Sequence, residues 1–389
     1  MSSGSGGACD DCLGRAWLLS RLAGHLDQAH DRVAELLTLT DPDLIAAVGG
    51  GRRATIERER AEFQAGGAPE ARRHASGAGL ELLCRCRAAY PEDLRMLAAP
   101  PAVLHILGGH QRFLTLVAGP AVAIVGARRP SPYGMTVTRS LGRGLAAAGL
   151  TVVSGMALGI DGAAHRGALD AGAALNAGPS EAGAVNVGAL TVAVLAGAAE
   201  TPYPPSARAL HRRLATEGTI VSELPPGTAV RRWMFPARNR IIAALSAMTV
   251  VVEARAQSGA LLTAGHAAGL GRALGAVPGR VTSPLARGPH ALLRAGARLV
   301  EGPEDVLEEL FGPDAPLRAR RTGRGLGAGS ALEPPLQALL DALAEGHGTA
   351  AALVHAGLDA DTGLAALAAL ELAGRIRRGA GGRFTVAPA

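Results

Sequence analysis

From Ala121 to about Gly312, short apolar runs alternate with longer segments in which apolar residues recur every three or four positions. The short runs predict buried strands and the longer segments predict helices. The expected strands are Val122–Val125, Thr151–Ser154, Thr191–Leu195, Thr219–Ser222, Thr249–Glu253, Ala273–Val277 and Arg298–Val300. The expected helices lie at about 134–148, 161–171, 206–216, 238–246, 259–270 and 288–295. Repeated strand–helix alternation predicts an α/β fold with a mainly parallel, doubly wound sheet.

The segments before this region have a different pattern. Residues 1–12 are rich in Gly and Ser, which predicts a disordered tail, and residues 13–88 carry apolar positions at helical spacing. We therefore expect a small helical domain, of the SAM or helix-hairpin-helix type, over 13–88. Residues 89–312 then form the main α/β domain, in which the small, polar stretch 173–189 indicates a surface insertion.

The C-terminal part predicts a linker and a second small domain. Residues 313–333 are rich in Pro, Gly and Arg and indicate a basic linker. Residues 334–389 contain three short helical patterns followed by GRIRRGAGGRFTV, which predicts a two-stranded ribbon with a glycine-rich turn. This arrangement favours a winged-helix-like domain. A plain protein–protein docking module remains open, because the third helical pattern lacks the side chains that read base edges.

Composition adds a preference for anionic partners. The chain has 389 residues, of which 48% are hydrophobic and only 3% aromatic, and its formal net charge is +6. All 39 basic residues are arginine, so every cation is a planar, permanently charged group suited to phosphate. The absence of lysine excludes a Walker A loop. No apolar run is long enough to cross a membrane and no signal peptide is evident, so we expect a cytoplasmic protein.

Four cysteines occur in two pairs. Cys9 and Cys12 have CxxC spacing, and Cys84 and Cys86 have CxC spacing. Together they could form a tetrathiolate zinc site. Because the pairs are far apart in sequence and the first lies in the Gly/Ser-rich tail, we favour reduced cysteines and predict no metal.

The stretch AVAIVGARRPSPYG, at 121–134, is the first candidate binding element. A buried strand ends there in a turn of small residues and two arginines, Gly126, Ala127, Arg128 and Arg129. Ligands of open α/β sheets bind outside the carboxyl ends of the strands. The following helix directs free N–H groups and the positive end of its dipole to the same place. We therefore expect this turn to bind an anion.

A second glycine-rich turn, SGMALGIDGAAH, follows the next strand. It contains Ser154, Gly155 and Gly159, and Asp161 is expected to cap the next helix. Its glycine spacing is not GxGxxG, which disfavours a dinucleotide site. Helix capping and packing explain Asp161 and His165 equally well.

The strongest nucleic-acid signal is RRWMFPARNR, at 231–240. Its arginines, among them Arg238 and Arg240, surround Trp233 and Phe235 in a chain with few aromatics. Bases stack on aromatic faces while arginines meet the backbone. Ser258 and Gly259 open another helix and could accept a phosphate, although a simple N-cap explains them too. No nucleophile elbow or metal-ligand spacing of the HExxH kind occurs, so we predict no catalytic residues.

Six stretches occur in the order found in the DNA-processing protein A (DprA/Smf) family: VGARRPSPYG, SGMALGID..AH, TVAVLAG….YP, FPARNRIIAALS, VVVEA…SGALLTA and AVPG…G….L…GARLV. The chain resembles this family strongly over 121–310 and more loosely over 13–110. The resemblance implies an extended Rossmann-like domain, without a cofactor, that binds single-stranded DNA regardless of sequence. It also implies a homodimer that loads a RecA-type recombinase during natural transformation.

The resemblance further implies roles for individual residues. The Gly126–Arg128 turn meets the DNA backbone, Gly159 and Asp161 shape the pocket, and the FPxRN segment lines it with Phe235, Pro236, Arg238 and Asn239. From the residues themselves we expect Arg128, Arg238 and Arg240 to contact phosphates, with Phe235 or Trp233 under a base.

Three departures from the family pattern stand out. Leu158 occupies a position where members often carry Lys or Arg, for which Arg129 or Arg166 could substitute. In the family the strand that begins here at Thr191 usually ends in several glycines, whereas LAGAAE has only Gly197. The 173–189 insertion is also unusual. Two other functions stay open. One is a nucleotide-processing enzyme such as a phosphoribohydrolase; that class needs a turn of the PGGxGTxxE type, and the corresponding AVPGRVTS of this chain does not have it. The other is a protein-interaction scaffold.

Overall fold

The computed structural model describes residues 7–29, 32–176, 189–313, 343, 367, 376–378 and 384–386. The chain divides into two units, Met1–Leu326 and Gly327–Ala389. None of the described helices is both long and apolar enough to cross a membrane.

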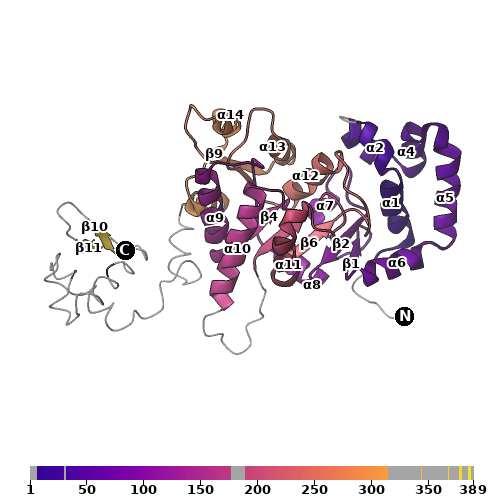
Figure 1. The fold of residues 1–389 in the computed structure, drawn as a ribbon, viewed down its shortest axis with the longest axis horizontal. Helices are drawn as coiled ribbons and strands as arrows, with labels where there is room; N and C mark the ends of the chain where they lie inside the picture. The colour runs from indigo at the N-terminus through magenta and orange to yellow at the C-terminus, as the bar shows by residue number, and fades with distance from the viewer. Residues whose placement is uncertain are drawn as a thin grey trace. The chain divides into compact units, whose positions relative to one another are not determined.

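The first unit is built on a nine-stranded sheet with the order β1-β2-β6-β5-β4-β3-β7-β8-β9 (Figure 1). The strands are β1 (Glu81–Cys84), β2 (Val103–Leu107), β3 (Ala121–Val125), β4 (Thr151–Ser154), β5 (Thr191–Val194), β6 (Thr219–Ser222), β7 (Met248–Val251), β8 (Ala273–Ala276) and β9 (Arg298–Leu299). The seven strands from β6 to β9 in this order are parallel. The strand β2 joins them antiparallel to β6, and β1 joins antiparallel to β2. The predicted α/β class and mainly parallel, doubly wound sheet are confirmed.

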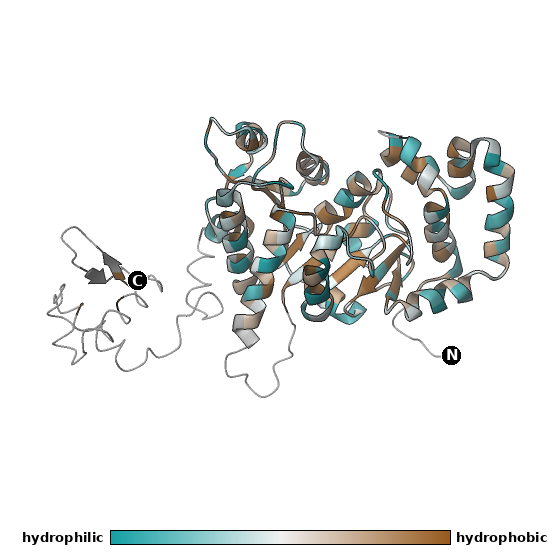
Figure 2. Cartoon of the chain, viewed as in Figure 1, coloured by the Kyte–Doolittle hydropathy of each residue, from teal (hydrophilic) through white to brown (hydrophobic). Residues whose placement is uncertain are grey.

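Helices cover both faces of the sheet. They are α7 (Glu92–Arg95), α8 (His110–Ala118), α9 (Pro132–Ala147), α10 (Ile160–Asn176), α11 (Arg208–Glu217), α12 (Met234–Ala244), α13 (Gly259–Gly269), α14 (Arg287–Arg294) and α15 (Pro303–Phe311). Successive residues of β3 alternate between the faces: Val122 and Ile124 pack under α9, α10 and α15, whereas Ala123 and Val125 pack under α8, α12 and α13. Figure 2 shows apolar strands enclosed by helices with hydrophilic outer surfaces.

The N-terminal residues form a helical region beside β1 and β2, drawn in indigo in Figure 1. Its helices are α1 (Asp10–Arg21), α2 (Ala23–Gln28), α3 (Val33–Thr38), α4 (Asp41–Val48), α5 (Arg53–Gly66) and α6 (Ala68–Gly77). Leucines at helical spacing make its core, and Trp233 from the α/β part is buried among them. The indole Nε1 of Trp233 donates to the carbonyl of Ala23 (2.9 Å), which fastens α12 to this region.

Two boundary predictions are wrong. The expected disordered tail over 1–12 contains a bridge from Gly7 to Leu83 and the start of α1, where Ala8 and Cys12 are buried. The expected helical stretch 13–88 contains β1, which is the edge strand of the sheet. Both errors arise because pairing between distant segments, rather than local composition, orders these residues.

The expected strands within the α/β region are all found, with ends that differ by at most two residues. The helix expected at 238–246 begins earlier, at Met234, so that the FPARN segment lies in the first turns of α12. In the second unit, β10 (Ile376–Arg378) pairs antiparallel with β11 (Phe384–Val386), which confirms the predicted ribbon. The winged-helix helices, the 313–333 linker and most of the 173–189 insertion lie outside the described residues; the first residues of that insertion end α10.

Candidate functional site

The topology places a crevice at the carboxyl ends of β3 and β7. From β3 the chain moves to β4, β5 and β6 on one side and returns to the other side of β3 with β7. Such a reversal separates the loops that follow the two central strands, which is where open α/β sheets bind ligands. The loop after β3 carries Arg128 and Arg129, and the loop after β7 carries Arg255 and Ser258.

A cavity of about 760 Å³ lies at this point. It is lined by most of the predicted residues, namely Gly126, Ala127, Arg128, Arg129, Asp161, Phe235, Pro236, Arg238, Asn239, Ser258 and Gly259. A smaller cavity of about 120 Å³ shares Arg128 and Phe235 with it and is lined by Gly155, Leu158 and Tyr203. Turns separated by more than a hundred residues in sequence therefore converge, as their positions after parallel strands predict.

Arg128 and Phe235 lie together on the boundary between the two cavities. The guanidinium carbon of Arg128 lies 4.9 Å from the ring centroid of Phe235, a cation–π distance. The ring of Tyr203 is 5.6 Å from the same ring, tilted by 52°. Arg128 and Tyr203 are exposed, and Phe235 is half-buried. This edge therefore offers a cation and an aromatic surface within reach of one ligand.

Arg238 has a different part in the site, because it is buried beneath the cavity. Its Nη1 donates to the carbonyls of Gly155 (2.7 Å) and Val194, which ties α12 to the turns after β4 and β5. Burial lowers the pKa of Arg238 to about 10, an effect that the nearby carboxyl of Asp161 opposes. It remains charged at neutral pH. Its Nε and Nη1 groups donate to the protein, and the residue also lines the cavity. That Arg238 contacts phosphate directly stays a prediction.

Asp161 holds the glycine-rich turn before α10. Its Oδ2 accepts from the backbone N–H groups of Gly155 (3.2 Å) and Ala157 (3.4 Å), so it orders the preceding loop rather than capping its own helix. Burial raises the pKa of Asp161. Gly159 has φ +80°, and a Cβ there would collide with the carbonyl of Ala127. The close contact between this turn and the Gly126–Arg128 turn therefore requires glycine at position 159.

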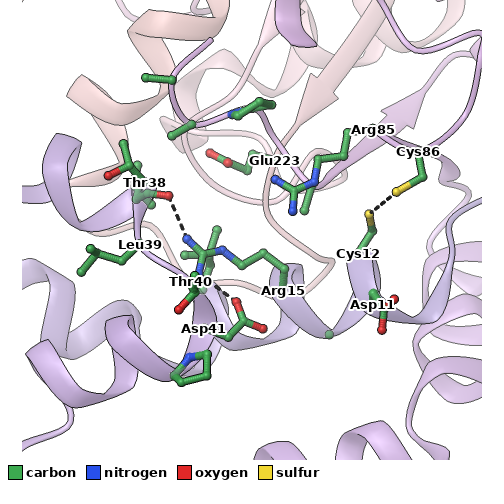
Figure 3. Close-up of a pocket in the computed structure, with 18 of the residues that line it drawn as sticks. Asp11, Cys12, Arg15, Thr38, Leu39, Thr40, Asp41, Arg85, Cys86 and Glu223 are labelled. Atoms are coloured by element: carbon green, nitrogen blue, oxygen red, sulfur yellow. Dashed lines mark hydrogen bonds and ion pairs between the residues drawn. The ribbon is translucent and has the colours of Figure 1, made fainter. Parts of the chain in front are cut away.

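Three other predicted contacts face the protein interior. Trp233 is buried against the N-terminal helices. Ser154 is buried, and its hydroxyl donates to the carbonyl of Ile124 (2.7 Å). Arg240 pairs with Glu223 (2.6 Å) and lines a separate cavity of about 570 Å³ between the N-terminal helices and the sheet, drawn in Figure 3. None of these three residues lines the β3–β7 cavity, and their DNA contacts stay predictions.

The two helix N-termini at the crevice differ. The N-terminus of α9, expected to attract an external anion, is already bound by the carboxylate of Glu253, which accepts from the N–H (2.8 Å) and hydroxyl (2.6 Å) of Ser131. The N–H of Ala127 likewise donates to the carbonyl of Glu253 (2.6 Å). The first turn of α13 instead lines the cavity, with Gly259 exposed and Ser258 capping the N–H of Ala260.

Sequence reasoning missed one cation of the site. Arg255 is exposed on the cavity wall after β7, as Arg128 is after β3. The signal was present in VVVEAR, where an arginine follows a buried strand directly. Leu262 and Gln257 also line the cavity and carry no sequence motif.

Comparison with known proteins relates the chain to one family. The family model for DNA recombination-mediator protein A matches residues 81–311. A putative DNA processing protein DprA from Mycobacterium tuberculosis is 46% identical over 208 residues, which are 54% of this chain and 49% of that protein. The DNA processing protein DprA of Streptococcus pneumoniae is 34% identical over 265 residues, which are 68% of this chain and 85% of that protein.

The fold agrees with these matches. The X-ray structure of DNA processing protein A from Streptococcus pneumoniae superposes with a TM-score of 0.59 at 28% identity, covering 77% of this chain and 96% of that chain. The chain spans about half the length of the mycobacterial relatives. The match to the family model covers more than half of the chain and includes every strand of the sheet. The chain therefore belongs to the DNA recombination-mediator protein A (DprA/Smf) family.

Proposed function

We propose that this protein binds single-stranded DNA without sequence preference at the crevice between β3 and β7. The observation that carries the proposal is the exposed guanidinium of Arg128 lying 4.9 Å from the Phe235 ring, where two cavities meet. Sequence-independent single-strand binding needs cations for the backbone and aromatic surface for the bases. Both are available here, the cation from the loop after β3 and the aromatic ring from the first turn of α12.

Phosphates would contact the exposed arginines of the crevice. Arg128, Arg129 and Arg255 are exposed, whereas the one acidic residue in the cavity lining, Asp161, is buried and held by backbone N–H groups. The wall is therefore positively charged. An unstacked base would pack against Phe235 and Tyr203 beside the smaller cavity. Duplex DNA has its bases stacked and paired and cannot make this contact, which favours the single strand.

The carboxylates of the crevice support a binding role over a catalytic one. Glu253 accepts hydrogen bonds from Ser131, and Asp161 accepts from the loop before α10. A phosphoribohydrolase-like reaction needs a carboxylate free to act on the sugar. We therefore propose that the site is not an enzyme active site.

We also propose that the bound strand is delivered to a RecA-type recombinase and that the protein acts in the cytoplasm as a homodimer. Membership of a family described as DNA recombination mediators supports the recombinase proposal. Light scattering of the purified chain tests the dimer. Recombinase filament formation on DNA covered by a single-strand-binding protein tests the loading step.

The substitution Arg128→Ala tests the binding site. A charge-assisted hydrogen bond contributes about 1.5–3 kcal/mol, so we expect affinity for single-stranded DNA to fall about tenfold or more. Losing one phosphate contact reduces the slope of log affinity against log salt by about 0.7. Arg73→Ala is the matched control, since Arg73 is an exposed arginine of α6 outside the cavity lining. If both variants bind as the parent does, Arg128 is not a phosphate contact.

A further inference from the structure

The four cysteines of the chain converge at one point of the fold. Cys9 precedes α1 and Cys12 lies in its first turn, whereas Cys84 ends β1 and Cys86 follows two residues later. Their four Sγ atoms all lie within 4.8 Å of one another. The two pairs are far apart in sequence, which on its own favours independent cysteines. The fold brings them together because the N-terminal segment pairs with the edge strand through Gly7 and Leu83.

The sulfur positions match a tetrahedral metal site. A zinc ion bound by four thiolates at about 2.3 Å requires neighbouring sulfurs about 3.8 Å apart. The Cys12–Cys86 and Cys9–Cys84 sulfurs are 3.6 Å and 3.9 Å apart. All four cysteines are free, and these distances are far longer than the bond of about 2.05 Å in a disulfide. Figure 3 shows Cys12 and Cys86 pointing toward one another.

Hydrogen bonds around the cluster hold the ligand loops in place. The N–H of Cys9 points at Sγ of Cys84 (3.4 Å), an arrangement that stabilises a thiolate. Arg95 donates to the carbonyls of Arg85, Arg87 and Tyr90, so the turn that carries Cys86 is fixed independently of any metal. A preformed ligand set lowers the entropy lost when a metal binds.

Burial and charge also suit a closed structural site. Cys12 and Cys84 are buried in a small apolar cluster with Ala8 and Leu13. A zinc tetrathiolate carries a net charge of −2, and arginines lie close by: Arg85 lines the same cavity wall as Cys12 and Cys86, and Arg87 donates to the carbonyl of Gly7. Four protein ligands leave no open position, which is typical of structural rather than catalytic zinc.

We propose that Cys9, Cys12, Cys84 and Cys86 bind one zinc ion that fastens the start of α1 to the edge strand of the sheet. Binding replaces the thiol protons of the ligating cysteines, which are released to solvent, and involves no change of oxidation state. The ion joins the N-terminal helical region to the α/β region, and none of its four ligands lines the β3–β7 crevice.

The test uses the full chain purified under reducing conditions without chelator. Elemental analysis is expected to give one zinc per chain. Exchange with Co²⁺ is expected to produce the visible bands of tetrahedral cobalt together with sulfur-to-cobalt charge transfer. Thermal unfolding of the chelated protein is expected at a lower temperature, restored by zinc.

Cys86→Ser is the variant to compare, because Cys86 is exposed and its replacement leaves the packed core intact. We expect its zinc affinity to fall at least tenfold. Asp11→Asn, next to Cys12 but not part of the sulfur cluster, is the control and is expected to retain one zinc. Less than a tenth of a zinc per chain with four freely titrating thiols overturns the proposal. Disulfides in the fresh protein, or bound iron in place of zinc, overturn it equally.

Discussion

Individual side chains of one type have different roles, and the two aromatics of the RRWMFPARNR stretch illustrate this. Trp233 is buried and donates to Ala23, whereas Phe235 lies half-buried beside Arg128. A local sequence pattern contains both and cannot distinguish them, because the partner of Trp233 lies more than two hundred residues away. Only the fold decides which ring is available to a ligand.

Substitution of the two aromatics separates binding from stability. Base–aromatic stacking contributes about 1–3 kcal/mol per base. We therefore expect Phe235→Ala to weaken single-strand binding by this amount at every salt concentration, with an unchanged salt slope because no charge is lost. Trp233→Phe removes the hydrogen bond to Ala23 and is expected to lower the melting temperature while leaving DNA affinity unaltered. The reverse pattern would show that Trp233, not Phe235, is the stacking residue.

Two buried histidines give stability a pH dependence. Burial lowers the pKa of His165 to about 3 and that of His105 to about 4, from 6.5 when exposed. The folded state then binds fewer protons than the unfolded state below pH 6.5. The contribution of these neutral histidines to the free energy of unfolding is fully present above pH 6.5. It is lost as the pH falls toward the folded pKa values, by up to about 1.4 kcal/mol per pH unit for each histidine.

Urea unfolding between pH 7.5 and about 5 measures this loss. His165→Gln is expected to reduce the slope of unfolding free energy against pH by about 1.4 kcal/mol per pH unit, which corresponds to one proton. Its Nδ1 contacts the Thr191 hydroxyl (2.8 Å), and the variant keeps a polar group able to do so. Identical slopes for variant and parent would mean that His165 is not buried in its neutral form.

At the scale of elements, the site is made by turns that follow parallel strands. Gly159→Ala tests whether the fit between the turns after β3 and β4 matters. The substitution adds left-handed backbone strain of about 1–2 kcal/mol and a collision with the carbonyl of Ala127, next to Arg128. We expect a loss of both stability and DNA affinity, measured by unfolding and by titration.

Gly149→Ala is the matched control. Gly149 has φ +89°, close to the φ of Gly159, but a Cβ there meets nothing within 4 Å. It is therefore expected to lose stability through strain alone and to keep its DNA affinity. Equal affinity in the two variants would contradict a role for the Gly159 turn in positioning Arg128.

Regular elements could be predicted because they depend on local patterns. The strands β3 to β9 are short apolar runs, and β4 and β6 were predicted with the observed ends. The strands β1 and β2 were missed, since ELLC and VLHIL lie outside the strand–helix alternation and become strands by antiparallel pairing. The position of Arg128 at the crevice followed from topology, whereas the inward direction of Arg238 and Arg240 depended on Gly155 and Glu223.

At the scale of the whole molecule, two long-range attachments join the N-terminal helices to the α/β region. Trp233 is buried among those helices, and the cysteine cluster connects α1 with β1. The crevice between β3 and β7 is separate from both, since neither attachment contributes a residue to its lining. Substitutions at these two attachments are therefore expected to change stability and to leave DNA binding unaltered.

The most direct test of the central claim is a competition experiment. Fluorescence anisotropy of a labelled oligo-dT strand is measured with the full chain at low and moderate salt, with unlabelled single strand or duplex of equal length as competitor. The account predicts tight, salt-sensitive binding that the single strand displaces and the duplex does not. Absence of binding, or equal displacement by the duplex, would contradict the assignment of the β3–β7 crevice as a single-stranded DNA site.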